Sequence, residues 1–327
     1  MFVRLLESFL SNVTTTLYKG ERIMKEKLNK YIMLLATIFW AGAFIAGKFS
    51  ISEFPVFSLV FFRFLIATII IFTIMIKVEE NWKITKKDLK MFLTLGIVGM
   101  VGYHVFFFLS LKYTTATNSS LIGATNPIVT TVLACIFLKE KITYKSIIGI
   151  MISLFGVMLI TTNGNINILL NLKFNIGDIL MIIAVVCWAT YGIISKKALE
   201  IYSPIKITSY AFLTCVIILL PLVIMEKPWV YLPNTSINGW ISVIYMAIFP
   251  SVFGYLIQQI SIKKIGPTKT SLYINLVPVF SMILAFFILG ESISFIKILA
   301  GLLIIIGICI NIMNKDIKNK EEAQTDN

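Results

Sequence analysis

One segment of the sequence occurs twice. The first copy runs from Lys112 to Ile142 and begins KYTTATNSSLIGATNP, and the second runs from Lys263 to Ile293 and begins KKIGPTKTSLYINLVP. In both copies a short polar turn leads into an apolar helix that contains a proline and ends at a glutamate. Identical pairs include Lys112 and Lys263, Ser120 and Ser271, Leu121 and Leu272, Pro127 and Pro278, Leu138 and Leu289, Glu140 and Glu291, and Ile142 and Ile293.

The chain is too apolar for a soluble protein. Of its 327 residues 58% are apolar and the mean hydropathy is +0.90, whereas about 45 to 50% of a soluble domain is apolar. Apolar runs of about 20 residues, the length that crosses a bilayer as a helix, fill nearly the whole sequence. The formal charge of +13 does not favour nucleic-acid binding, because the basic residues stand in short segments between these runs, as in membrane proteins.

The apolar runs predict an all-α membrane protein with ten transmembrane helices. We expect helices at residues 31–50, 56–76, 91–111, 116–138, 145–162, 178–198, 204–225, 238–260, 267–289 and 295–313. The predicted parts are a cytoplasmic N-terminal extension (1–30), repeat 1 (31–162), repeat 2 (178–313) and a cytoplasmic tail (314–327). Within residues 1–23 the apolar spacing favours an amphipathic helix at the membrane surface. The alternative is that translation starts at Met24.

Basic residues are distributed unequally between the two sides of the predicted helices. Alternate connections and the termini carry 23 Lys and Arg residues on one side and 5 on the other, with Arg63 left inside a helix. Because basic loops are retained in the cytoplasm, we expect both termini to be cytoplasmic. The expected location is the cell (inner) membrane, crossed many times.

The duplication extends to the first helix of each half. WAGAFIAGK from Trp40 resembles WATYGIISK from Trp188, so the first five predicted helices match the last five. Because five is odd, the second half must enter the membrane from the opposite face, which gives two inverted five-helix repeats. Inverted repeats are typical of secondary transporters, whose solute binds near the bilayer midplane between the halves. This pattern favours transport by alternating access.

These motifs resemble those of a known family, the EamA-type ten-span permeases of the drug/metabolite transporter superfamily. The resemblance covers residues 31 to 313 and rests on AxxSSLIxxxxP from Ala116, LKE and LGE at the ends of the paired helices, FRF at Phe62, and glycine-spaced closing helices. It implies a transporter of small metabolites, with export of amino acids or related compounds as the favoured function. The alternatives are efflux of multiple drugs or cationic compounds and, less favoured, an intramembrane enzyme.

Ionisable residues inside a predicted helix are costly in lipid and indicate functional positions. Arg63 is predicted either to anchor a carboxylate or phosphate of the solute or to serve as a structural charge. His104 and Tyr255 lie at the same depth in the two halves and either face a central cavity or pack between helices. No Asp or Glu lies deep in a predicted helix, so we expect facilitated or exchange transport, with proton coupling only through His104 if at all.

Aromatic and uncharged polar residues complete the candidate binding site. Trp40 and Phe44 share one face of the first helix, as Trp188 and Tyr191 do in the sixth, and they either line the cavity or pack between helices. Side-chain amides inside a membrane must face protein or water. The predicted solute-binding residues are Trp40, Phe44, His104, Asn118, Ser119, Asn126, Trp188, Tyr191, Tyr255, Gln258, Tyr273 and Asn275.

Proline and glycine positions predict where helices break and where they approach closely. Pro127 and Pro278 interrupt helices at matching positions, which indicates either hinges beside the solute site or kinks that serve packing. Gly96, Gly99 and Gly102 follow one another at helical spacing. We expect these glycines to allow a neighbouring helix to approach.

Residues that other functions would need are missing from the sequence. The four cysteines lie in apolar runs without CxxC spacing, and the single histidine cannot form a metal site alone. GxSxG and HExxH patterns are also missing. We therefore expect no enzyme activity, metal or cofactor. The expected partners are a small-molecule solute and the lipid bilayer, without nucleic acid, and both a monomer and a homodimer remain open.

Overall fold

The structure is a computed structural model that describes residues 22–171, 174–290 and 292–325. The regular elements of this described part are all helices. The amphipathic helix predicted within residues 1–23 falls almost wholly outside it. In the first half the helices are α2 (Arg22–Ser50), α3 (Val56–Val78), α4 (Lys86–Thr94), η1 (Leu95–Gly102), α5 (Tyr103–Tyr113), α6 (Ala116–Gly123), α7 (Asn126–Leu138), α8 (Tyr144–Thr162) and α9 (Ile166–Leu170). In the second half they are α10 (Ile176–Ala198), α11 (Pro204–Met225), α12 (Pro228–Tyr231), η2 (Leu232–Asn234), α13 (Ile237–Met246), η3 (Ala247–Gly254), α14 (Tyr255–Leu272), η4 (Tyr273–Leu276), α15 (Val277–Leu289) and α16 (Phe295–Thr325).

Seven helical stretches of the described chain are long and apolar enough to cross a membrane. They are Val56–Val78, Lys86–Tyr113, Asn118–Leu138, Tyr144–Thr162, Ile176–Ala198, Pro204–Met225 and Ile237–Ile288. The last stretch has 52 residues, which corresponds to about 78 Å of helix against a hydrocarbon core of about 30 Å. It is interrupted at Gly266, whose φ of 83° and ψ of 164° are not helical. Two shorter apolar helices, Ile32–Gly47 and Phe295–Asn311, accompany the seven.

The outer surface of the bundle is apolar, as a lipid-facing surface requires. Ile69, Ile136 and Ile217, on α3, α7 and α11, are 61 to 62% exposed. The buried interior of the described part, in contrast, contains His104, Asn126 and many serine and threonine side chains. Large exposed apolar surfaces are unusual in soluble proteins, and this distribution is the one expected of helices packed together within a bilayer.

Both predicted proline interruptions are present. Pro127 lies in the first turn of α7 after a break that follows Gly123, and Pro278 lies in the first turn of α15 after the 3₁₀ turn η4. Proline is tolerated there because the first turn of a helix leaves its N–H groups without intrahelical partners. The two helices also end alike, since Lys139 (φ 56°) and Gly290 (φ 68°) adopt the left-handed conformation at their C-termini.

Wide π-helical turns occur at matching positions of the two halves. η1 joins α4 to α5, and η3 joins α13 to α14. When the two halves are aligned so that Lys112 matches Lys263, η1 and η3 begin and end within one residue of each other. π-helical turns are rare and are frequently found at functional sites, so they single out the middle of these two helical stretches.

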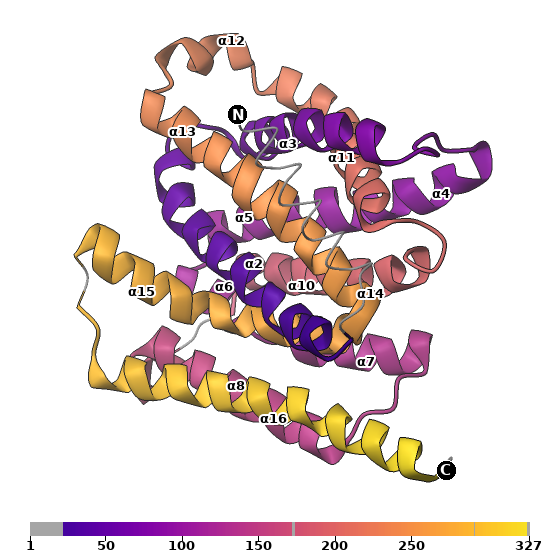
Figure 1. Ribbon diagram of the computed structural model, residues 1–327. Coiled ribbons are helices and arrows are strands. Elements are labelled where there is room, and N and C mark those ends of the chain that lie inside the picture. Colours follow the sequence, from indigo (N-terminus) through magenta and orange to yellow (C-terminus); the bar gives the residue numbers. More distant parts are fainter. Residues whose placement is uncertain (1–21, 172–173, 291, 326–327) are drawn as a thin grey trace.

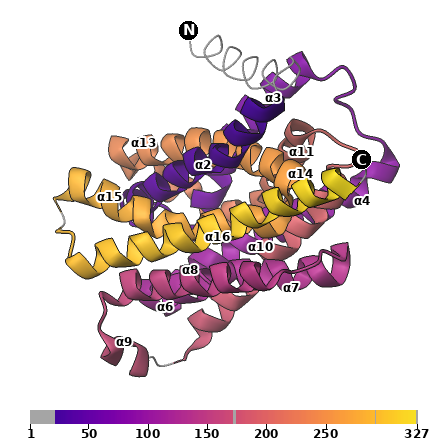
Figure 2. The same ribbon diagram turned by 60° about the horizontal axis from the view of Figure 1, so that its bottom comes forward.

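The closing helices of the two halves, α8 and α16, lie side by side along one edge of the bundle (Figures 1 and 2). A Cβ atom added to Gly149 would lie 2.5 Å from the carbonyl oxygen of Gly307, and one added to Gly307 would lie 2.5 Å from the carbonyl oxygen of Gly149. Gly156 approaches the carbonyl oxygen of Ala300 in a similar way, at 2.8 Å. The glycine spacing seen in the sequence therefore allows two backbones to touch.

The predicted role of the glycines in η1 is confirmed. A Cβ atom at Gly99 would overlap the ring of Tyr191, and one at Gly96 would overlap Thr214. A Cβ at Gly102 would lie 3.0 Å from the sulfur of Cys187. These contacts bring η1 against α10 and α11, and they position the aromatic side chains of α10 in the interior.

Polar contacts join α3 and α11 at both ends. At one end the Glu226 carboxylate accepts hydrogen bonds from the backbone N–H groups of Phe57 and Ser58, at 3.2 and 2.8 Å, which caps α3. At the other end Lys206 donates to the carbonyl oxygens of Asn81 and Lys83, at 2.6 and 2.9 Å. These contacts connect α11 to the start of α3 and to the segment that follows α3.

Candidate functional site

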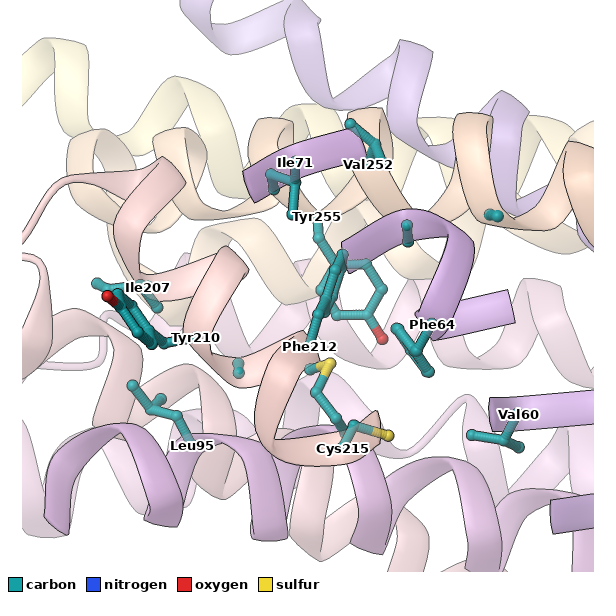
Figure 3. Packing of buried hydrophobic residues seen from close by; sticks show 14 of the residues in the cluster. Val60, Phe64, Ile71, Leu95, Ile207, Tyr210, Phe212, Cys215, Val252 and Tyr255 are labelled. Carbon is teal, nitrogen blue, oxygen red and sulfur yellow. The ribbon is translucent and has the colours of Figure 1, made fainter. Parts of the chain in front are cut away.

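Aromatic side chains from both halves meet in the interior and form what we call the central cluster. The ring centroids of Trp188 and Tyr255 lie 5.6 Å apart, and that of Trp40 lies 6.1 Å from Trp188. Figure 3 shows Tyr255 beside Phe64 and Phe212, from α3 and α11. Its members are Trp40, Phe64, Tyr103, His104, Trp188, Tyr191, Phe212 and Tyr255.

His104 and Tyr255 are in direct contact. The Tyr255 hydroxyl lies 3.1 Å from His104 Nε2, and His104 Nδ1 lies 2.9 Å from the Met100 carbonyl oxygen. Because a carbonyl oxygen only accepts, Nδ1 carries a hydrogen, and in the neutral ring Nε2 accepts the Tyr255 hydrogen. Both side chains are almost fully buried. The two residues that match in the sequence thus form one hydrogen-bonded pair. Tyr255 follows η3 directly, and His104 is the second residue after η1.

Arg63 lies beside the central cluster in the first half of α3. Its Nε donates to Ser251 Oγ at 2.8 Å, and the Ser251 hydroxyl donates to the Met246 carbonyl oxygen at 2.9 Å. The guanidinium carbon lies 5.3 Å from the centroid of the Phe64 ring. Among the described residues no carboxylate pairs with this buried cation, although burial of an unpaired charge is costly.

A glutamine side chain links α14 to α10. Gln259 Nε2 donates to the Tyr191 hydroxyl and to Ser195 Oγ, at 2.5 and 3.1 Å. Its Oε1 and that of the neighbouring Gln258 are buried without a protein partner in the described part. Unpaired buried acceptors of this kind are uncommon.

The structure brings together five of the twelve predicted solute-binding residues, namely Trp40, His104, Trp188, Tyr191 and Tyr255. Gln258 lies one residue before the glutamine that contacts Tyr191. The side chain of Phe44 lies outside the part of the chain whose side chains the structure describes.

The other predicted polar residues make separate contacts. Asn118 donates to the Asp178 carboxylate at 3.2 Å, where α10 begins, and Ser119 hydrogen-bonds to Ser110 at 2.9 Å. The Asn126 side chain accepts from Thr130 at 3.2 Å. Asn275 on η4 donates to Ser153 of α8 at 2.9 Å, and Tyr273 on the same turn packs in the cluster of buried residues along α8 and α16.

Four functional candidates escaped the sequence analysis, namely Phe64, Tyr103, Phe212 and Ser251. Ser251 occupies the position that matches Met100 in the duplication, and Tyr103 precedes His104, so a comparison of the two halves around His104 could have found both. Phe64 is the last residue of the FRF motif, next to Arg63, which was a signal for it, whereas Phe212 is one of 25 phenylalanines in an apolar chain and nothing in the sequence distinguishes it.

A cavity of about 450 Å³ opens between α4, α7 and α10. We call it the lysine cavity, because Lys87, Lys90 and Lys197 line its mouth. Thr94 and Thr190 line it further along α4 and α10. The cavity lies at the start of α4 and at the ends of α7 and α10. These helix ends are on the side of the bundle where most of the basic residues are found.

The matching place in the other half is filled. At the sequence offsets of the two halves, Thr94 corresponds to Tyr245 and Thr190 to Gly42. A Cβ atom at Gly42 would overlap the Tyr245 hydroxyl, and that hydroxyl donates to the Phe39 carbonyl oxygen at 3.3 Å. Phe249 stacks on Tyr245, with centroids 5.2 Å apart. The two sides of the bundle therefore differ in that one contains a cavity and the other a packed tyrosine.

Apolar helices of membrane-spanning length around buried polar side chains define an integral membrane protein. The sequence profile of the EamA-like transporter family matches residues 30–162 and 175–313. The chain belongs to this family of transporters, which confirms the resemblance to EamA-type permeases of the drug/metabolite transporter superfamily and points away from an enzyme.

Similar proteins bear transporter names. The uncharacterized transporter YyaM of Bacillus subtilis (strain 168) is 36% identical over 223 residues, which are 68% of this chain and 73% of the relative. A probable terminal-alkyne amino-acid exporter of Streptantibioticus cattleyicolor is 25% identical over 73% of this chain and 78% of its own length. A solved crystal structure has the same fold, with a TM-score of 0.70 and 17% identity over 87% of this chain and 96% of that one.

Proposed function

We propose that the protein exports amino acids or related small carboxylates across the cell membrane by alternating access. In this proposal the solute binds near the midplane at the central cluster, and both termini lie in the cytoplasm. The observation that carries the proposal is the hydrogen bond between His104 and Tyr255, residues from matching positions that meet beside π-helical segments and next to the unpaired Arg63 guanidinium.

Contacts between matching positions support an arrangement of ten helices in two inverted repeats. Two matched residues can touch each other only where a symmetry axis passes between them, as at an isologous interface. His104 and Tyr255 touch, as do Trp40 and Trp188. In α8, Gly149 faces Gly307, which matches Gly156, and Gly156 faces Ala300, which matches Gly149. In this arrangement the 52-residue stretch crosses twice, turning at Gly266, and the two shorter apolar helices also cross.

The difference between the two sides supports alternating access. In an inverted repeat the two halves exchange conformations when the transporter changes its open side. The lysine cavity and the packed Tyr245 occupy matching places, one open and the other filled. In our proposal this is the conformation open towards the cytoplasm, from which an exporter takes up its solute.

Three features of the site support a solute with a carboxylate and an apolar or aromatic part. The guanidinium of Arg63 has N–H groups beyond the Nε that binds Ser251, and arginine is well suited to bind a carboxylate in two-pronged geometry. The aromatic rings of the central cluster suit an apolar side chain. The unpaired oxygens of Gln258 and Gln259 suit an ammonium donor, and one relative is named as an amino-acid exporter.

Counterflow in proteoliposomes tests this function. Purified protein is reconstituted into vesicles preloaded with amino acids, nucleosides or cationic dyes, and uptake of trace labelled solute is measured. We expect accumulation with an apolar or aromatic amino acid. Accumulation with cationic dyes alone would favour multidrug efflux, and no counterflow of a carboxylate by folded protein would contradict the proposal.

Two variants connect the activity to the central cluster. We expect Tyr255→Phe to lower counterflow about tenfold, which is the effect of one buried hydrogen bond of about 1.4 kcal/mol, and His104→Ala, which removes two hydrogen bonds, to lower it at least as much. The matched control is Tyr210→Phe, which loses a hydroxyl that binds the Trp82 carbonyl oxygen at 3.0 Å, away from the cluster. Equal losses in Tyr255→Phe and Tyr210→Phe would remove the cluster from the transport site.

A double substitution should close the open side. Thr94→Tyr with Thr190→Gly copies the Tyr245 and Gly42 pair into the lysine cavity, and we expect it to favour the opposite conformation. The measurement is maleimide labelling of a single cysteine at Leu133, on the cavity wall, in a variant without the four native cysteines. Labelling should slow about tenfold, as a conformational bias of about 1.4 kcal/mol would produce. The separate Thr190→Gly variant is the control, and unchanged labelling in the double variant would contradict alternating access at this cavity.

A further inference from the structure

The lysine cavity combines a basic mouth with an apolar wall. Lys87 and Lys90 lie one turn apart on α4, and Lys197 approaches from the end of α10. The wall includes Met91, Leu133 and Phe137, and the Phe137 side chain is 57% exposed on the outer surface of α7. The cavity thus joins the three ammonium groups to the lipid-facing surface of the bundle.

The three lysines have no acidic partner in the part of the chain that the structure describes. The Asp88 carboxylate, between Lys87 and Lys90 in the sequence, accepts from the backbone and hydroxyl of Thr85, at 2.8 and 2.9 Å, and from the Tyr202 hydroxyl. The hydrogen bond to Asp88 raises the pKa of Tyr202 to about 12, so the tyrosine stays a donor at neutral pH.

The acidic side chains after the other two lining helices are not part of the cavity wall either. Glu140, beyond the end of α7, accepts from Thr268 at 2.8 Å. Glu200, on the turn after α10, is exposed. Three positive charges therefore converge on a cavity whose own wall supplies no anion.

We propose that the lysine cavity binds the phosphate group of an anionic phospholipid, with one acyl chain along Leu133 and Phe137. The lysines lie at the basic ends of α4 and α10, which is the level of the lipid headgroups, and basic pockets between helices at this level suit anionic headgroups. A chain on the exposed face of Phe137 stays in contact with the surrounding lipid. This inference concerns the same cavity that our proposed function opens towards the cytoplasm, but lipid binding to it can be measured without transport.

The test measures lipid binding to the purified full-length protein. Native mass spectrometry with phosphatidylglycerol and phosphatidylcholine gives the affinity for each lipid. We expect one phosphatidylglycerol to bind tightly and phosphatidylcholine to bind weakly. Replacing Lys87, Lys90 and Lys197 together with glutamine should weaken phosphatidylglycerol binding on the order of 100-fold, roughly fivefold for each lysine.

Two further variants separate the cavity from general surface charge. The control replaces Lys139, Lys141 and Lys145, exposed lysines of the connection between α7 and α8 and the start of α8, with glutamine. It removes the same charge and should change the affinity less than about twofold, since these lysines lie outside the cavity. Leu133→Trp keeps all three cavity lysines but fills the space for the acyl chain, and it should also abolish tight lipid binding.

Soluble glycerol phosphate distinguishes the lipid from a free phosphate compound. We expect it to compete poorly, because it lacks the acyl chain. Competition at concentrations similar to the lipid, or lipid binding unchanged in Leu133→Trp, would overturn the proposal in favour of a soluble phosphate. Equal losses in both triple-lysine variants would overturn it in favour of non-specific attraction to the basic side.

Discussion

Gly307→Val is expected to destabilise the protein strongly. Its Cβ would lie 2.5 Å from the Gly149 carbonyl oxygen and 2.7 Å from the Ser153 backbone nitrogen, so α8 and α16 would have to separate. Neither obstacle is the end of a flexible side chain. We expect a loss of about 3 kcal/mol or more, the upper part of the range for overpacking, with a large fall in the yield of monodisperse protein and in thermal stability in detergent.

The control for this experiment lies on the same helix. A Cβ at Gly301 would meet only Val279, at 3.6 and 3.9 Å, which is ordinary contact. Gly301→Ala should therefore leave the thermal stability unchanged or raise it slightly, because alanine favours a helix over glycine. If Gly307→Val were as stable as Gly301→Ala, the close contact between α8 and α16 would be wrong.

Arg63→Met is expected to abolish transport of a carboxylate solute while the protein remains folded. Removing one partner of a buried charged hydrogen bond costs about 2 to 5 kcal/mol, so counterflow should fall on the order of 100-fold. Methionine fills similar volume without a charge, and no described carboxylate loses its partner. Thermal stability in detergent should therefore change little.

Ser251→Ala separates a solute-binding role of Arg63 from a structural one. The Ser251 hydroxyl connects Arg63 to the Met246 carbonyl oxygen, and the alanine variant removes this connection but keeps the cation. If Arg63 binds the carboxylate, Ser251→Ala should retain most counterflow and Arg63→Lys should retain little, because lysine lacks the planar fork. Equal losses in Ser251→Ala and Arg63→Met would identify Arg63 as a residue that only supports η3.

The sequence was sufficient for the class of protein and for the centre of the candidate site. Apolar runs and the duplication depend on local composition and order, so helices, proline breaks and the pairing of His104 with Tyr255 could be predicted from them. The contact between these two residues depends on how the halves pack. The sequence places them at the same depth but does not say that they face each other.

Other features depend on the packing of helices far apart in the chain. Asn118 is one of the predicted solute-binding residues, and its contact with Asp178 at the start of α10 could not be predicted, because it depends on the turn after α5 lying against that helix. The lysine cavity arises where three helices diverge, and Thr94 and Thr190 give no sign of it in the sequence. The sequence shows that Tyr245 and Gly42 stand at the positions that match Thr94 and Thr190, but it does not show that Tyr245 and Gly42 touch each other.

The π-helical segments limit how this site can evolve. His104 and Ser251 donate to the carbonyl oxygens of Met100 and Met246, within η1 and immediately before η3, and lipid offers no substitute donor. Mutations at these two positions would remove a hydrogen bond to the backbone at the wide turns. Adaptation to a new solute should therefore proceed through the surrounding rings, such as Trp40 and Tyr191, which could diversify among relatives while the polar residues beside the wide turns change slowly.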